Sequence, residues 1–152
     1  MRRLVTFLAT GGYLGYLPLM PGTFGATLGL FLSWWLCAPL WTRSPAAFLM
    51  LFGVLFVAGC FIAGSAEQDF ADHDAAQIVL DEVFGMIATM FLNPGGWLVL
   101  LGGFALFRAF DIIKPWPVSY FDRLHGGTGV MLDDLAAAIY ANLVLQIVRR
   151  VV

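Results

Sequence analysis

A run of nineteen residues without a charged side chain, residues 46–64, constrains the fold of this chain more than any other segment. An α-helix needs about 20 predominantly apolar residues to cross the hydrocarbon core of a bilayer. Inside lipid, backbone polar groups must be paired within the segment itself, so a run of this kind has to be helical. The segment therefore predicts a membrane-spanning helix.

The composition shows that this run is not isolated. Apolar residues make up 61% of the 152 residues and charged residues only 12%, whereas soluble domains are roughly 25% charged. Further apolar segments cover residues 24–41, 78–92, 97–110 and 131–148, separated by glycine, proline and polar residues. No segment alternates as a half-buried strand does. We expect one domain, residues 1–152, folded as an all-α, membrane-embedded bundle of about five apolar helices, with residues 1–20 as an interfacial segment.

Alternate crossings of the membrane would bring the polar motifs to one face. The turn at Pro21, the acidic cluster 67–74 and the polar stretch 108–134 would share that face, and the breaks at 43–45 and 93–96 would lie opposite. The first face carries five basic residues and the second three. Cytoplasmic segments are enriched in lysine and arginine, so the first face is predicted to be cytoplasmic.

One acidic pair does not fit a simple crossing. Glu82, beside Asp81, is eleven residues before Asn93, which is only about 16 Å of helix against a hydrocarbon core of ~30 Å. Either the pair lies partway into the membrane zone, or the 78–110 hairpin does not span fully. In both cases the carboxylates must face protein, water or a metal, because unpaired carboxylates in a membrane are costly.

The stretch from Arg108 to Asp134 gathers cations and carboxylates within an apolar protein. Guanidinium and ammonium groups suit phosphate oxygens, and carboxylates suit a hard divalent cation such as Mg²⁺. The pattern predicts metal-assisted phosphate chemistry. Basic residues are too few and scattered for a nucleic-acid-binding surface. The predicted metal ligands are two adjacent pairs, Asp81-Glu82 and Asp133-Asp134, and the predicted phosphate-binding cations are Arg108, Lys114 and Arg123.

Several of these residues have an alternative interpretation. Asp133-Asp134 could stabilise a helix start through the helix dipole, and Arg123 could extend toward lipid headgroups. Asp111 could be a further ligand or could orient Lys114. His73, which precedes Asp74, and His125 are candidate acids or bases, although either histidine could be a hydrogen-bonded structural residue.

The order of these motifs resembles that of the phosphatidylglycerophosphatase A family. The resemblance runs from about Pro21 into the last helix. It is carried by Pro21-Gly22-Thr23-x-Gly25, His73-Asp74, Asp81-Glu82-x-x-Gly85-Met86, Phe107-Arg108-x-x-Asp111-x-x-Lys114-Pro115-x-Pro117, Phe121-Asp122-Arg123, His125-Gly126-Gly127-x-Gly129 and Asp133-Asp134.

Membership would imply a multi-pass enzyme of the bacterial inner membrane that hydrolyses phosphatidylglycerophosphate to phosphatidylglycerol with Mg²⁺, its site facing the cytoplasm. The phospholipid substrate and the bilayer would be its partners. The expected catalytic residues are His73, Asp74, Asp111 and His125, and Thr23 joins the three cations as a substrate-binding residue. We expect metal-activated water as the nucleophile.

The competing function class is a small ion carrier or channel, because carboxylates in a membrane also mark ion pathways. A carrier would place polar residues at several depths, whereas here they gather toward one face.

Overall fold

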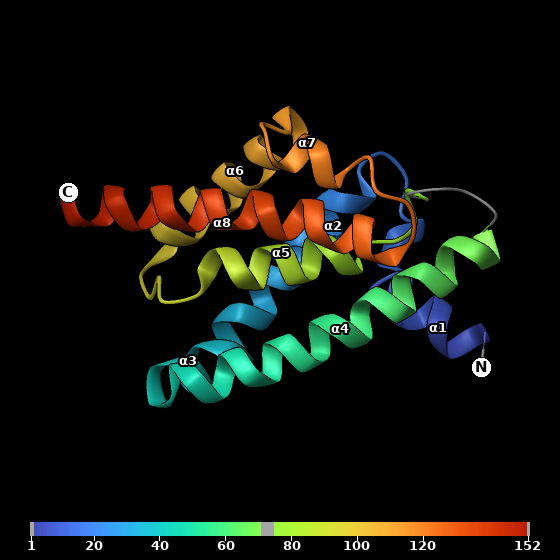
Figure 1. The fold of residues 1–152 in the computed structure, drawn as a ribbon. Helices are drawn as coiled ribbons and strands as arrows, with labels where there is room; N and C mark the ends of the chain where they lie inside the picture. The colour runs from blue at the N-terminus through green and yellow to red at the C-terminus, as the bar shows by residue number, and fades with distance from the viewer. Residues whose placement is uncertain (1, 71–74, 152) are drawn as a thin grey trace.

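The computed structural model describes residues 2–70 and 75–151, and its regular elements in these ranges are all helical (Figure 1). This confirms the predicted all-α class. The elements are α1 (Arg2–Ala9), the 3₁₀ turn η1 (Leu14–Tyr16), α2 (Pro21–Leu32), the π-helical turn η2 (Ser33–Cys37), α3 (Ala38–Arg43), α4 (Pro45–Phe70), α5 (Leu80–Met90), α6 (Trp97–Ile113), α7 (Val118–Phe121) and α8 (Gly127–Val151).

Three helical segments are long and apolar enough to cross a membrane: Pro21–Arg43, which joins α2 to α3, Pro45–Phe70 and Gly127–Val151. These three segments indicate a membrane protein. The 11 residues of α5 extend about 16 Å, and the 17 residues of α6 about 25 Å, both less than a ~30 Å hydrocarbon core. The expected count of about five apolar helices is not confirmed.

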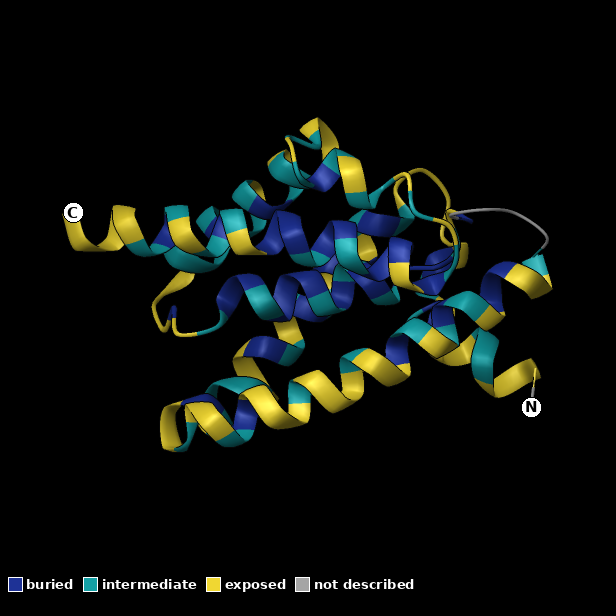
Figure 2. Cartoon of the chain, in the orientation of Figure 1, coloured by how far each residue is buried: buried dark blue, intermediate teal, exposed yellow. Residues whose placement is uncertain are grey.

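Helix α5 occupies the centre of the bundle and contacts α2, α4, α6 and α8. Figure 2 shows its residues as buried or intermediate, and Met86 is completely buried. Glycines allow this close packing. A Cβ at Gly29 of α2 would lie 2.6 Å from the carbonyl oxygen of Val83, and one at Gly85 would lie 2.6 Å from the ring of Phe107. The short helix is thus enclosed by protein, and its acidic first turn is held inside the bundle.

Helix α4 lies on the outside. Its apolar residues are largely exposed, as Figure 2 shows, and Met50 and Phe61 are 71% and 74% exposed. The helix approaches α8 through small residues: a Cβ at Gly64 would lie 3.1 Å from the backbone nitrogen of Gly127. An exposed apolar surface of this extent suits contact with lipid.

The helices alternate in direction, so the polar segments gather toward one end (Figure 1). The starts of α2, α5 and α8 and the end of α4 lie toward that end. The α3–α4 turn, the α5–α6 loop and the C-terminus lie toward the other. The N-terminal segment packs against α4, where Arg2 Nε lies 3.2 Å from Asp69 Oδ1.

The expected start of the last helix is wrong. Helix α8 begins at Gly127, so Asp133 and Asp134 lie in its second turn and not at its start. The explanation that they stabilise the helix dipole at a first turn therefore fails. Helix α2 has Met20 as its N-cap and Pro21 as its first residue. Because Pro21 fixes the start of the helix, Thr23 lies inside the first turn of α2 and not at its N-cap.

Candidate active site

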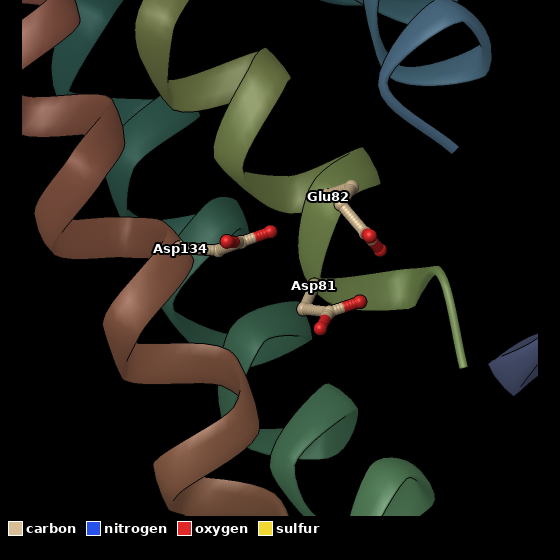
Figure 3. A group of neighbouring side chains, drawn as sticks. All are labelled: Asp81, Glu82 and Asp134. Carbon is tan, nitrogen blue, oxygen red and sulfur yellow. The ribbon is translucent and has the colours of Figure 1, made fainter. Parts of the chain in front are cut away.

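Three carboxylates from two helices meet inside the bundle (Figure 3). Asp81 and Glu82 come from the first turn of α5, and Asp134 comes from the second turn of α8. One oxygen atom from each lies within 4.8 Å of the other two. Asp81 and Asp134 are buried, and Glu82 is half-buried. The structure thus brings together three of the four predicted metal ligands.

Protein groups compensate these carboxylates poorly. Among the described residues, Glu82 Oε2 and Asp134 Oδ2 are buried oxygens without a hydrogen-bond partner. Burial raises the pKa of Glu82 to about 8; a hydrogen bond with Asp81 opposes this rise, and the charges of Asp134 and Asp111 add to it. Crowded carboxylate oxygens with unused lone pairs fit a hard divalent cation. The residues present therefore fit such an ion.

The fourth predicted ligand, Asp133, is directed toward a cation of the protein itself. Its Oδ2 accepts a hydrogen bond of 2.7 Å from Lys114 Nζ, and its Oδ1 accepts one of 2.9 Å from the backbone N–H of Asp134. Lys114 caps the end of α6 in the left-handed conformation, with φ 47°, and also donates to Asp122. Burial lowers the pKa of Lys114, but its hydrogen bonds and charge interactions with Asp122 and Asp133 outweigh burial and raise it above its usual range.

A second ion pair lies one turn earlier on α6. Arg108 Nη1 donates to Asp111 Oδ2 at 2.6 Å, and the two side chains are 18% and 14% exposed. The guanidinium group is thus fixed in direction, and it carries four further N–H donors. The charge of Asp111 acts on both Glu82 and Asp134, so this ion pair borders the carboxylate cluster.

Gly22 lies against both Arg108 and Glu82. The sequence alone assigned no role to this glycine. A Cβ at this position would lie 3.1 Å from Arg108 Nη1 and would collide with Glu82 Oε1. The first turn of α2 therefore passes directly against Glu82 and Arg108, and a glycine is required for that approach. The available signal was a glycine in the first turn of a helix, directly after the Pro21 that starts it.

The other predicted residues lie around this centre or outside the described ranges. Thr23 is half-buried in the first turn of α2, next to Gly22. Arg123 and His125 are exposed on the connection between α7 and α8. The remaining two, His73 and Asp74, lie outside the described residues.

Comparison with known proteins gives a consistent result. The family model described as phosphatidylglycerophosphatase A matches residues 7–149. Curated relatives named phosphatidylglycerophosphatase A include one from Haemophilus influenzae, 38% identical over 93% of this chain and 86% of its own, and one from Escherichia coli, 36% identical over 93% and 81%. A third relative, from Bacteroides thetaiotaomicron, is named putative phosphatidylinositol-3-phosphatase and is 32% identical over 98% of this chain and 96% of its own. No solved structure matches the chain.

Proposed function

The chain belongs to the phosphatidylglycerophosphatase A family, and from that premise we propose that it hydrolyses phosphatidylglycerophosphate to phosphatidylglycerol and phosphate within a membrane. The three carboxylates that meet at the polar end of an apolar bundle, where Glu82 Oε2 and Asp134 Oδ2 are buried without a hydrogen-bond partner among the described residues, are the observation that carries this proposal. A lipid phosphatase needs such a centre close to lipid, and the exposed apolar surface of α4 supports that location.

Asp81, Glu82 and Asp134 would hold Mg²⁺, the cation that an all-carboxylate set of this kind suits. When bound, a divalent cation supplies charge neutralisation on the phosphate and a water of lowered pKa for attack on phosphorus. Asp133 takes a different role in this proposal from the one that the sequence predicted. By accepting hydrogen bonds from Lys114 and from the Asp134 backbone, it positions these residues and does not bind the ion.

Substrate phosphate would be held by groups that border the cluster. Arg108, oriented by Asp111, is fixed beside Glu82 and carries further N–H donors that suit phosphate oxygens. The first turn of α2 adds the backbone N–H of Gly22 and the hydroxyl of Thr23 at the positive end of a helix, while the Thr23 N–H itself donates to the carbonyl oxygen of Met20 at 3.0 Å. His125 and Arg123 are exposed before α8 and within reach of solvent, which suits contact with a lipid headgroup or proton transfer to the leaving alcohol.

For orientation, we propose the inner membrane of a bacterium with this polar end facing the cytoplasm. The alternating helices and the larger number of basic residues at this end support that arrangement. In a background lacking Cys37 and Cys60, a cysteine at Gly96, which is exposed and where a Cβ would meet nothing within 4 Å, should react with an impermeant thiol reagent from outside, and one at the exposed Thr128 should not. Labelling of Thr128→Cys alone would show that the polar end faces the outside of the cell.

The activity is tested by phosphate release from phosphatidylglycerophosphate in detergent micelles, with Mg²⁺ and with a chelator. We expect release only with the cation. Phosphatidylinositol 3-phosphate belongs in the same experiment because of the third relative's printed name. Faster phosphate release from phosphatidylinositol 3-phosphate than from phosphatidylglycerophosphate would show that the inositol lipid is the preferred substrate. Absence of release from both, together with cation flux into vesicles that contain the protein, would favour the ion-carrier class.

A further inference from the structure

A groove of about 590 Å³ opens between α6 and α8, far from the carboxylate cluster. The volume falls within the roughly 300–1,000 Å³ of small-ligand pockets. Two small residues of α6, Gly102 and Ala105, line it together with the larger apolar residues Leu98, Leu106, Leu145 and Val148. A lining of this kind accepts an apolar chain and offers it no hydrogen bond.

An arginine completes one end of the groove. Arg149, in the last turn of α8, lines it, and its Nη1 lies 3.5 Å from Oδ1 of Asn93. Asn93 is only 1% exposed, and its amide donates to the carbonyl oxygen of Thr89 at 3.2 Å. The buried asparagine therefore directs its oxygen at the guanidinium. Because asparagine is neutral, this contact orients Arg149 without cancelling its charge.

The surrounding charge is positive. Arg43 is in the last turn of α3, and Arg149 and Arg150 are in the last turn of α8; both helix ends lie toward the end of the bundle opposite the start of α5 (Figure 1). Every acidic residue of the chain falls between Glu67 and Asp134, and none of those that the structure describes lines the groove. An anionic ligand complements such a surface.

We propose that this groove binds one anionic phospholipid, with an acyl chain against Gly102 and Ala105 and its phosphate accepting hydrogen bonds from Arg149. The site is separate from the proposed active site. Arg149 follows Asp134 by fifteen residues of one helix, which is about 22 Å. Stabilisation of the helix dipole also explains an arginine in the last turn of α8, but it applies equally to Arg150. Substituting Arg149 and Arg150 one at a time can therefore separate phospholipid binding from stabilisation of the helix dipole.

The chain offers a variant that fills the groove. A Cβ at Gly102 would meet only Leu145 Cδ1, at the ordinary distance of 3.6 Å. Gly102→Leu should therefore occupy the groove without displacing backbone. Arg149→Gln removes the cation, and Arg150→Gln is its matched control from the same turn. Native mass spectrometry of each purified protein in detergent, titrated with dioleoylphosphatidylglycerol or with dioleoylphosphatidylcholine, would measure lipid affinity without depending on hydrolysis.

The parent should bind one phosphatidylglycerol more tightly than phosphatidylcholine. Arg149→Gln and Gly102→Leu should each lose about tenfold in affinity, as expected for a charge-assisted hydrogen bond or a blocked chain site. Arg150→Gln should stay within about twofold. Equal affinity for both lipids, or equal affinity in all four proteins, would overturn the proposal. So would a lipid-free dimer that Gly102→Leu abolishes, because the occupant would then be a second copy. If Gly102→Leu fails to fold, Ala105→Leu takes its place at the same groove.

Discussion

Replacing Lys114 by methionine should destabilise the protein through the carboxylate that it leaves behind. Asp133 is 9% exposed at its side chain, and Lys114 is 27% exposed. Removing one partner of a fully buried ion pair costs about 3–5 kcal/mol. Since Lys114 is partly solvated, we reduce this to about 2–3 kcal/mol. For a chain of this size the loss corresponds to a decrease in Tm of roughly 4–12 °C.

The measurement is Tm in detergent, followed by intrinsic fluorescence. Asp122→Asn is the control. Because the Asp122 side chain is 38% exposed, this variant should lose at most about 1 kcal/mol of unfolding free energy. The double variant Lys114→Met/Asp133→Asn should recover part of the lost stability because the buried Asp133 charge is removed, while the Asp122 carboxylate that also loses Lys114 is 38% exposed and partly solvated. The pKa of Lys114 is raised, so its ion pairs contribute fully at neutral pH and are lost only as pH rises through that higher value. A Tm for Lys114→Met within about 2 °C of the parent, or an equal loss in Asp122→Asn, would refute this reasoning.

Three other predictions concern the site. Glu82→Gln should lower phosphate release about a hundredfold, or ~2.7 kcal/mol, and should shrink the rise in Tm that Mg²⁺ gives the parent; an unchanged rise would place the ion elsewhere. Gly22→Ala should lower activity by a similar factor by displacing Glu82 and Arg108, whereas Gly53→Ala, where nothing lies within 4 Å, should leave activity unchanged. Because the pKa of Glu82 is raised to about 8, a proton competes with the cation below that pH, so Mg²⁺ affinity measured by calorimetry should increase from pH 6 to pH 8; affinity that is independent of pH would contradict it.

Helix α4 was predictable because contact with lipid acts on each residue separately. The uncharged run at 46–64 lies within Pro45–Phe70, and it needed no knowledge of neighbouring helices. The helix extends past the run because Glu67 and Asp69 are accommodated by protein: Glu67 is buried, and Asp69 pairs with Arg2. The end of the helix thus depends on tertiary contacts that hydropathy does not report.

The split between Asp133 and Asp134 could not be predicted. Successive residues of an α-helix point about 100° apart, so an acidic pair indicates carboxylates without saying which one faces the centre. The rotation of α8 decides this. That rotation is set by close contacts such as Gly64 with Gly127, and it turns Asp134 toward Asp81 and Glu82 while Asp133 meets Lys114.

The partners of Lys114 were missed for a related reason. A cation within a stretch of cations and carboxylates predicted a phosphate ligand, with Asp111 as one possible partner. Its hydrogen bonds instead reach Asp122, eight residues away, and Asp133, nineteen residues away. Contacts at such separations depend on how α6, α7 and α8 meet. Local pattern does not determine them.

Phosphate release by Asp134→Asn, measured as Mg²⁺ is titrated, tests most directly the claim that Asp81, Glu82 and Asp134 hold the ion that hydrolysis requires. The change keeps the shape of the side chain and removes one charge from the cluster. We predict a loss of about a hundredfold or more in rate that saturating Mg²⁺ does not restore, in a protein whose Tm without the ion is not lowered. Hydrolysis at the parent's rate, with half-saturation at the same Mg²⁺ concentration, would contradict the assignment of the site.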